Sequence, residues 1–232
     1  YLDSLLQDTL RLSSTYNNLA DLYLTAQRSE DGKQYIDHAI ELEHSQAHPE
    51  KLSIRYGMAA ELYVKLGLLP EALDFACKAY ALDMKSGDTL KIARRLSQMG
   101  DVYAAMQNLD EAEKVYRKSS ELLELLDERT SLAINYKQMG GLHIRKGNLL
   151  LAIRYLEKSA TIAEEIGNKY LLRLVYEKLY RLYRPDRPAL ALEYMEKFSQ
   201  LKDSLYTEKT NRLLSDYQVK YETAKKDATI HR

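Results

Sequence analysis

The sequence predicts an all-α protein, an α-solenoid of stacked antiparallel helix pairs, and two observations carry this prediction. The first is a repeat of 40 residues, marked by a mostly aromatic position at Tyr23, Tyr63, Tyr103, His143 and Tyr183. The second is the composition, with 45% hydrophobic residues but only 4 Pro and 9 Gly, too few for an all-β protein. Five copies at one spacing indicate small units stacked in a row.

Each repeat has the pattern of two helices joined by a short turn. Leu96, Met99 and Tyr103 place large apolar residues at i, i+3 and i+7, which is one face of a helix. Breaks follow at residues 65–70, 105–110 and 145–150, where Gly67, Asn108 and Gly147-Asn148 suit a left-handed helix stop. The second helix then carries small residues on one face. Ala72 and Ala79 are seven apart and so share that face. The position of Ala72 recurs as Gly32, Ala112 and Ala152, with Leu192 at the same spacing.

A second set of small residues lies in the middle of each first helix, at Ala20, Ala60, Gly100 and Gly140. A glycine inside a helix costs about 1 kcal/mol relative to alanine, so its recurrence needs a reason. Two antiparallel helices approach closely only where one side chain is nearly absent. We interpret these four positions as packing sites. The fifth repeat has Tyr180 there, which predicts a looser crossing.

The segment "LSQMGDVYAAMQNLDEAEKVYRKSSEL" (residues 96–122) carries these positions in full and resembles the tetratricopeptide repeat family. The resemblance implies a right-handed α-solenoid of about five repeats, in a variant with 40 rather than 34 residues per repeat. The predicted array spans residues 1–203. It comprises a partial repeat (1–11, the second helix of an earlier unit) and repeats at about 12–51, 52–91, 92–131, 132–171 and 172–203.

Residues 204–232 are expected to form a C-terminal capping or connector helix, because they contain no Gly or Pro. Their loose apolar stripe suggests possible self-association through this segment. The stretch "LKDSLYTEKT" with "YQVKYETAKKD" resembles the connector of Bacteroidetes membrane sensors. That resemblance implies the sensor region of a signalling receptor with a histidine kinase or a transcriptional regulator as output. It also implies an extracytoplasmic location and a longer parent chain, through which alone the membrane would be reached.

The sequence predicts neither catalysis nor a bound cofactor or metal. No phosphate loop or nucleophile motif occurs, and the His44–His48 pair lacks further ligands in its pattern. His143 is expected to replace a packing tyrosine, and Cys77 is expected to be buried. Lys and Arg number 34, as do Asp and Glu, so the balance of charge argues against nucleic-acid binding. No run of about 20 apolar residues is present.

Binding of a protein or peptide in the concave groove is the remaining function. The first helices of a solenoid line the concave side, so their exposed positions are candidate contacts. These candidates are Asn17, Asp21, Glu61, Lys65, Arg94, Asp101, Lys137, Arg145, Glu177 and Arg181. Asp21 and Glu61 argue against capture of a carboxylate. Arg94, Lys137, Arg145 and Arg181 suggest a basic strip for an acidic peptide, although an ordinary solvated groove has the same composition.

Three functions therefore stay open. The first is a sensory, protein-binding module of a signalling receptor. The second is a free-standing cytoplasmic scaffold or adaptor that binds peptides. A third, an α-helical protein that holds a small sugar in the groove, is weaker, because no closed, apolar-lined pocket is evident in the pattern.

Overall fold

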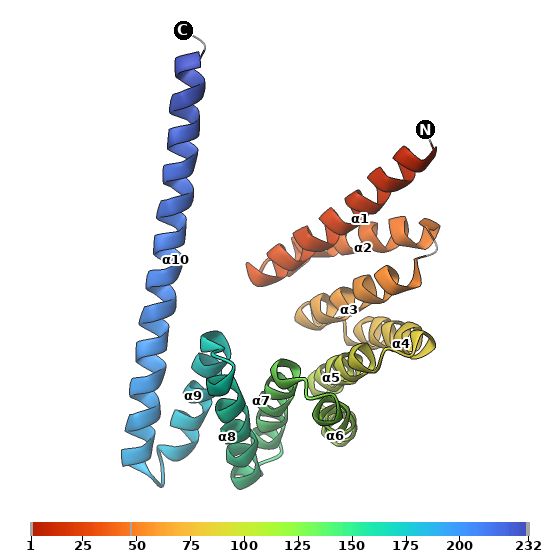
Figure 1. The fold of residues 1–232 in the computed structure, drawn as a ribbon. Helices are drawn as coiled ribbons and strands as arrows, with labels where there is room; N and C mark the ends of the chain where they lie inside the picture. The colour runs from red at the N-terminus through yellow and green to blue at the C-terminus, as the bar shows by residue number, and fades with distance from the viewer. Residues whose placement is uncertain (1, 47, 231–232) are drawn as a thin grey trace. The chain divides into compact units, whose positions relative to one another are not determined.

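The computed structural model describes residues 2–46 and 48–230, and the part it describes contains ten helices and no strand (Figure 1). The chain forms two compact units, Tyr1–Asn148 and Leu149–Arg232. The all-α prediction is confirmed. The helices are α1 (Leu2–Thr25), α2 (Ser29–Gln46), α3 (Pro49–Lys65), α4 (Leu69–Ser86), α5 (Thr89–Ala105), α6 (Leu109–Leu125), α7 (Arg129–Arg145), α8 (Leu149–Glu165), α9 (Lys169–Tyr183) and α10 (Pro188–Ile230).

The first unit stacks helix pairs in chain order, α1 with α2, α3 with α4 and α5 with α6, followed by α7 (Figure 1). Each second helix also packs on the first helix of the next pair. The first helices contact one another directly, α1 with α3, α3 with α5 and α5 with α7. Within the described residues no such contact joins α2 to α4 or α4 to α6, so the first helices form the inner, concave side of this unit.

The turn inside each pair repeats its backbone geometry whether or not it holds glycine. Gly67 and Gly147 have φ of 76° and 77°, and Gln27 and Gln107 occupy the same place with φ of 60° and 64°. The next amide closes the turn on the helix, as in Asn108 N–H to Tyr103 O at 2.9 Å. The prediction that Asn108 is the left-handed residue is wrong by one position. Packing of the flanking helices imposes this conformation on two glutamines.

The small residues of the first helices are buried, as predicted for a close crossing. Ala20 is 0% and Ala60 1% exposed, and Gly100 and Gly140 are buried as well. A Cβ atom on Gly100 would lie 2.4 Å from Cε1 of Tyr116, on the partner helix α6. The position equivalent to Tyr116 in the preceding pair holds Ala76. The glycine therefore compensates for a larger residue across the crossing, which confirms a packing role.

The chain start differs from the predicted partial repeat at 1–11. Residues 2–25 form one continuous helix, α1, so no separate second helix of an earlier unit is present there. The later pairs begin at residues 49, 89, 129 and 169, about three residues before the predicted boundaries. The spacing of 40 is retained because each first helix starts at the same phase of its repeat.

In the second unit α8 packs on α9 and α9 on α10. Helix α10 is continuous from Pro188 to Ile230, so no break separates the predicted fifth repeat from the segment at 204–232. The turn at residues 184–187 shifts the phase of α10 by one residue: Ala191 is 3% exposed and Leu192 55%. Ala191, rather than Leu192, is therefore the buried small residue equivalent to Ala152. The reason is that α10 begins at Pro188, one residue earlier than the repeat of 40 predicts.

Candidate functional site

The concave side of the first unit contains a cavity of about 430 Å³. Four successive first helices, α1, α3, α5 and α7, contribute its lining. The lining consists of Leu24, Ala60, Glu61, Val64, Lys65, Gln98, Asp101, Val102, Lys137 and Gln138. A second cavity of about 320 Å³ shares Glu61, Gln98, Asp101 and Gln138 and extends to Arg94 and Ser131. A groove of this size accommodates several side chains of a ligand.

Asp101 is the most enclosed acid of the groove. The Tyr116 hydroxyl donates to its Oδ1 at 2.5 Å, and Gln138 Nε2 donates to its Oδ2 at 2.5 Å. Ser97 Oγ in turn donates to Gln138 Oε1 at 2.7 Å and fixes the amide. Burial raises the pKa of Asp101 to about 6, while the Tyr116 hydrogen bond and Lys137 act in the opposite direction. Both carboxylate oxygens are thus oriented by neutral donors.

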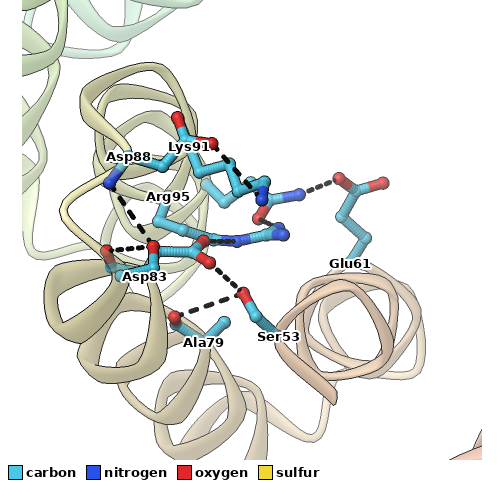
Figure 2. Close-up of polar contacts among 9 residues, drawn as sticks. Ser53, Glu61, Ala79, Asp83, Asp88, Lys91 and Arg95 are labelled. Carbon is cyan, nitrogen blue, oxygen red and sulfur yellow. Dashed lines mark hydrogen bonds and ion pairs between the residues drawn. The ribbon is translucent and has the colours of Figure 1, made fainter. Parts of the chain in front are cut away.

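Glu61 is connected to the buried core through Gln98 and Arg95. Gln98 Nε2 donates to Glu61 Oε1 at 2.5 Å, and Arg95 donates through Nη1 to Gln98 Oε1 at 2.5 Å. Arg95 also donates through Nε to Asp83 Oδ2 at 2.9 Å, and Figure 2 shows Arg95 lying between Asp83 and the helix that carries Glu61. Burial is the main cause that raises the pKa of Glu61. The core ion pair therefore determines where the groove amide points.

A polar triad anchors this connection inside the stack. Ser53 Oγ donates to Asp83 Oδ1 at 2.6 Å and lies 3.4 Å from the carbonyl of Ala79 (Figure 2). The side chains of Asp83 and Arg95 are only 2% and 11% exposed. Forty residues earlier, a related triad contains Ser13, Glu43 and Arg55, with Ser13 Oγ donating to Glu43 Oε2 at 2.8 Å. There Arg55 Nε donates to Ser13 Oγ at 3.2 Å, and Arg55 Nη2 lies 3.6 Å from Glu43 Oε2.

Four predicted contact residues meet at the larger cavity: Glu61, Lys65, Asp101 and Lys137. Arg94 borders the smaller cavity, where its Nη2 lies 3.7 Å from Glu128 Oε1. On α1, Asn17 is buried at 8% exposure and Asp21 is exposed. Arg145 is exposed at the end of α7. In the second unit, Arg181 pairs with Glu177 at 2.6 Å.

The predicted basic strip is largely compensated by neighbouring acids. Arg94 has Glu128 beside it, Arg181 has Glu177, and Lys137 acts electrostatically on Asp101. A strip whose cations already have acidic neighbours attracts an anion weakly. The centre of the groove presents the carboxylates of Glu61 and Asp101 together with the amino groups of Lys65 and Lys137.

The sequence reasoning did not single out Gln98, Gln138 and Tyr116, which orient the two carboxylates. A signal was present, because Gln98 and Gln138 are 40 residues apart and both precede a Met-Gly pair. Reading each position down the repeats, one column at a time, would have found them.

The histidines and the cysteine that the sequence singled out do not form a common site. His44 lies in α2 and its Nε2 is 2.6 Å from the Tyr56 hydroxyl, whereas His48 precedes α3. Among the described residues no group of three or more His, Cys, Asp or Glu could hold a metal ion. His143 is 1% exposed, which confirms its packing role, and burial lowers its pKa. Cys77 is exposed, so its predicted burial is wrong: it lies on the outer face of α4, beside the buried Ala76. In the part of the chain that is described, no helix has the length and apolar character needed to cross a bilayer.

Comparison with known proteins gives the family. A tetratricopeptide repeat family model matches residues 88–165, and a second model of the same family matches residues 13–44. No curated protein sequence matches the chain significantly.

Solved structures with the same fold cover most of the chain. The repeats of a kinesin light chain from Podosopora anserina align with a TM-score of 0.62 at 14% identity, over 86% of this chain and 98% of theirs. Aspartyl phosphate phosphatase F from Bacillus subtilis aligns with a TM-score of 0.63 at 14% identity, over 83% and 60%. A Rap protein in complex with Competence and Sporulation Factor aligns with a TM-score of 0.66 at 14% identity, over 91% and 64%. At these identities the likeness concerns the fold. The chain contains tetratricopeptide repeats at residues 13–44 and 88–165, and the solved structures share its fold.

Proposed function

We propose that this chain is a non-catalytic interaction module that binds a protein or peptide segment on the concave side of residues 2–148. The observation that carries the proposal is the convergence of Glu61, Lys65, Asp101 and Lys137, from three successive first helices, around one cavity. The carboxylates of Glu61 and Asp101 are held in place by hydrogen bonds from Gln98, Gln138 and Tyr116. Such preorganisation lowers the entropic cost of binding a ligand.

The related folds support a polypeptide as the ligand. One Rap protein of this fold was solved in complex with Competence and Sporulation Factor. The groove of the present chain is lined by both charged and apolar side chains, namely Leu24, Val64 and Val102 beside the carboxylates. A polypeptide matches this mixture, because its side chains alternate between polar and apolar chemistry.

The finer proposal is that the module is the partner-sensing region of a signalling receptor whose output is a histidine kinase or a transcriptional regulator, with the sensor outside the cytoplasm. Two observations support it. A structural neighbour from Pyrococcus horikoshii is a signal transduction ATPase with a tetratricopeptide repeat sensor. Helix α10 continues without a break for 43 residues, and a rigid helix is suited to carry a displacement away from a repeat array.

The alternative is a free-standing cytoplasmic adaptor that binds peptides. It is supported by the likeness of the fold to the repeats of a kinesin light chain. Fractionation of cells that express the complete gene product separates the two proposals. Recovery with membranes supports the receptor, and recovery in the soluble fraction supports the adaptor.

Selection from a random peptide library displayed on phage tests the proposed binding function. Enriched peptides are expected to lose at least about tenfold in affinity for a Gln98→Ala/Gln138→Ala variant, because the groove carboxylates lose their orienting donors. Glu121→Gln, an exposed change on the second helix α6, is the matched control and should bind as the wild type does. Enrichment of no peptide, or of peptides that bind both variants equally, would contradict the proposal.

A further inference from the structure

The larger cavity combines two surfaces that suit one kind of side chain. Leu24, Val64 and Val102 provide apolar walls, and Glu61 and Asp101 provide carboxylates in the same cavity of about 430 Å³. Arginine and lysine have this composition in reverse, an apolar stem that ends in a cationic group. Their stems pack against aliphatic walls while the charged group reaches an acid.

The two carboxylates are oriented for such a group. Gln98 holds Oε1 of Glu61, while Tyr116 and Gln138 hold the two oxygens of Asp101. Amide and hydroxyl donors fix the direction of a carboxylate without removing its charge. Burial raises the pKa of Asp101 and of Glu61, because it disfavours the charged form of each carboxyl group.

A third acid continues the row on the neighbouring helix. Asp21, Glu61 and Asp101 are separated by 40 residues each and occupy the same place on α1, α3 and α5. Asp21 acts electrostatically on Glu61 and contributes to its raised pKa. We name Asp21, Glu61 and Asp101 the acidic row. Lys65 and Lys137 belong to the lining of the cavity and equal Glu61 and Asp101 in number, while Asp21 lies outside that lining and adds a third acid to the row.

A buried acceptor on α1 lies on the same helix face as Asp21. Asn17 is 8% exposed, and within the described part of the chain its side-chain Oδ1 has no hydrogen-bond partner. Residues 17, 21 and 24 share one face of α1, and Leu24 on that face lines the cavity, whereas Asn17 lies outside the lining.

We infer that the cavity binds an arginine or lysine side chain of the partner polypeptide, with Glu61 and Asp101 as its carboxylate partners; this rests on the proposed function. The acidic row also sets the spacing of basic residues in the ligand. Packed helices lie about 8–10 Å apart, and a polyproline II chain has three residues per turn and advances about 3.1 Å per residue. In a ligand of this conformation, basic residues three positions apart lie on one side at about that distance and face neighbouring members of the row.

The test uses fluorescein-labelled peptides of ten residues on a glycine-serine background. One peptide carries two arginines three positions apart, a second carries them adjacent, and a third carries citrulline at both places. Citrulline keeps the shape of arginine but has no charge. Fluorescence anisotropy at pH 7.5 is expected to show the spaced arginine peptide binding at least about tenfold more tightly than the citrulline peptide. The adjacent arginines should bind with intermediate affinity.

Variants of the full chain link the affinity to the site. Glu61→Gln and Asp101→Asn should each weaken the spaced arginine peptide by about tenfold, and Glu121→Gln should leave it unchanged. Thermal melting followed by circular dichroism checks that each variant is folded. Equal affinity for the arginine and citrulline peptides, or no loss in Glu61→Gln, would overturn the inference. So would an acidic peptide that binds more tightly and depends on Lys65.

The outcome also separates this inference from the proposed function. Library peptides that depend on Gln98 and Gln138 but bind without any basic residue would leave the interaction module intact and exclude the basic ligand. A library that yields no groove-dependent peptide would contradict both.

Discussion

Two neighbouring junctions between helix pairs are packed with different residues. The second junction joins α3 and α4 to α5, and the third joins α5 and α6 to α7. At the second junction, Ser53, Asp83 and Arg95 form a buried ionic triad. At the third, the equivalent positions hold Ala93, Leu123 and Asn135, all 0% exposed. Both junctions belong to the same unit and join helices of 17 or 18 residues. The comparison shows that the ion pair is not required for stacking, because two apolar residues and a neutral amide fill the same space.

The hydroxyl that bridges the two helices of each pair also changes sides. In the first two pairs Ser13 and Ser53 on the first helix face the carbonyls of Ala39 and Ala79 on the second. In the third pair Ser119 on the second helix donates to the carbonyl of Ala93 on the first, at 2.7 Å. Each of these three pairs therefore has a hydrogen bond from a serine hydroxyl to a carbonyl of the other helix, but in the third pair the serine lies on the second helix instead of the first.

The arginine of the triad requires a glycine opposite it, and the third junction has no such requirement. A Cβ on Gly57 would lie 1.9 Å from Nη1 of Arg95, so the glycine makes room for the guanidinium. The equivalent residue at the next junction is Ser97, beside Asn135 instead of arginine. In this unit a larger side chain from a neighbouring helix accompanies a glycine opposite it, at Gly57 with Arg95 and at Gly100 with Tyr116.

The largest effect is expected from Arg95→Ala, which breaks the triad. The substitution leaves the Asp83 carboxylate, 2% exposed, without its cation. Loss of one partner of a buried ion pair costs about 3–5 kcal/mol in the free energy of unfolding. Urea-induced unfolding followed by circular dichroism measures the loss, and hydrogen exchange locates it in α3, α4 and α5.

The control uses the alanine and leucine of the third junction at positions 53 and 83, and replaces Arg95 by an apolar side chain of similar length. The variant Ser53→Ala/Asp83→Leu/Arg95→Met removes all three polar groups together and should lie within about 1–2 kcal/mol of the wild type. If the triple variant is as unstable as Arg95→Ala, then the ion pair is required for this junction and the comparison fails.

Gly100→Ala is expected to have the next largest effect. Its Cβ would lie 2.4 Å from the ring of Tyr116, which is 2% exposed and held by Asp101. Overpacking of this kind costs about 1–3 kcal/mol in the free energy of unfolding. Gly141→Ala is the matched control, because nothing lies within 4 Å of its added Cβ. It should stabilise the protein by about 0.5–1 kcal/mol. Equal effects of the two alanines would exclude a close crossing at Gly100.

Gly57→Ala is expected to destabilise the protein when Arg95 is present and to stabilise it when Arg95 is replaced by alanine. In the wild type the added methyl displaces the Arg95 guanidinium from Asp83 and Gln98 and should destabilise by about 1–2 kcal/mol. In the Arg95→Ala background the space is free, and alanine should stabilise the helix by about 0.5–1 kcal/mol. A double-mutant cycle of urea midpoints measures the coupling. Additive effects would show that Gly57 and Arg95 are independent.

The smallest effect is a dependence on pH that arises at Asp101. Burial raises its pKa to about 6 from an ordinary value of 3.8. The folded protein therefore keeps a proton between these values that the unfolded chain has lost, so this group stabilises the fold at acid pH and loses that contribution as pH rises through 6. The free energy of unfolding of Asp101→Asn, relative to that of the wild type, should rise by about 1 kcal/mol between pH 4 and pH 7.5. The effect is small because the carboxylate is partly open to water. A constant difference over this range would contradict the raised pKa.

Much of the architecture follows from the sequence alone. The period of 40, the helix pairs and the buried small positions are local or periodic properties, since helix faces follow from a spacing of 3.6 residues. Four of the contact residues predicted from the repeat phase line one cavity, because residues 40 positions apart occupy equivalent places on neighbouring first helices.

Only the tertiary structure decided which side chains cross from one helix to another. The link from Asp83 through Arg95 and Gln98 to Glu61 joins three helices, and a single helical period contains no information about such distances. The phase shift at Ala191 likewise depends on how the turn at residues 184–187 packs. Periodicity identifies the face of each helix, whereas the contacts between faces depend on the sizes and charges of residues far apart in the chain, which act together only once the helices are stacked.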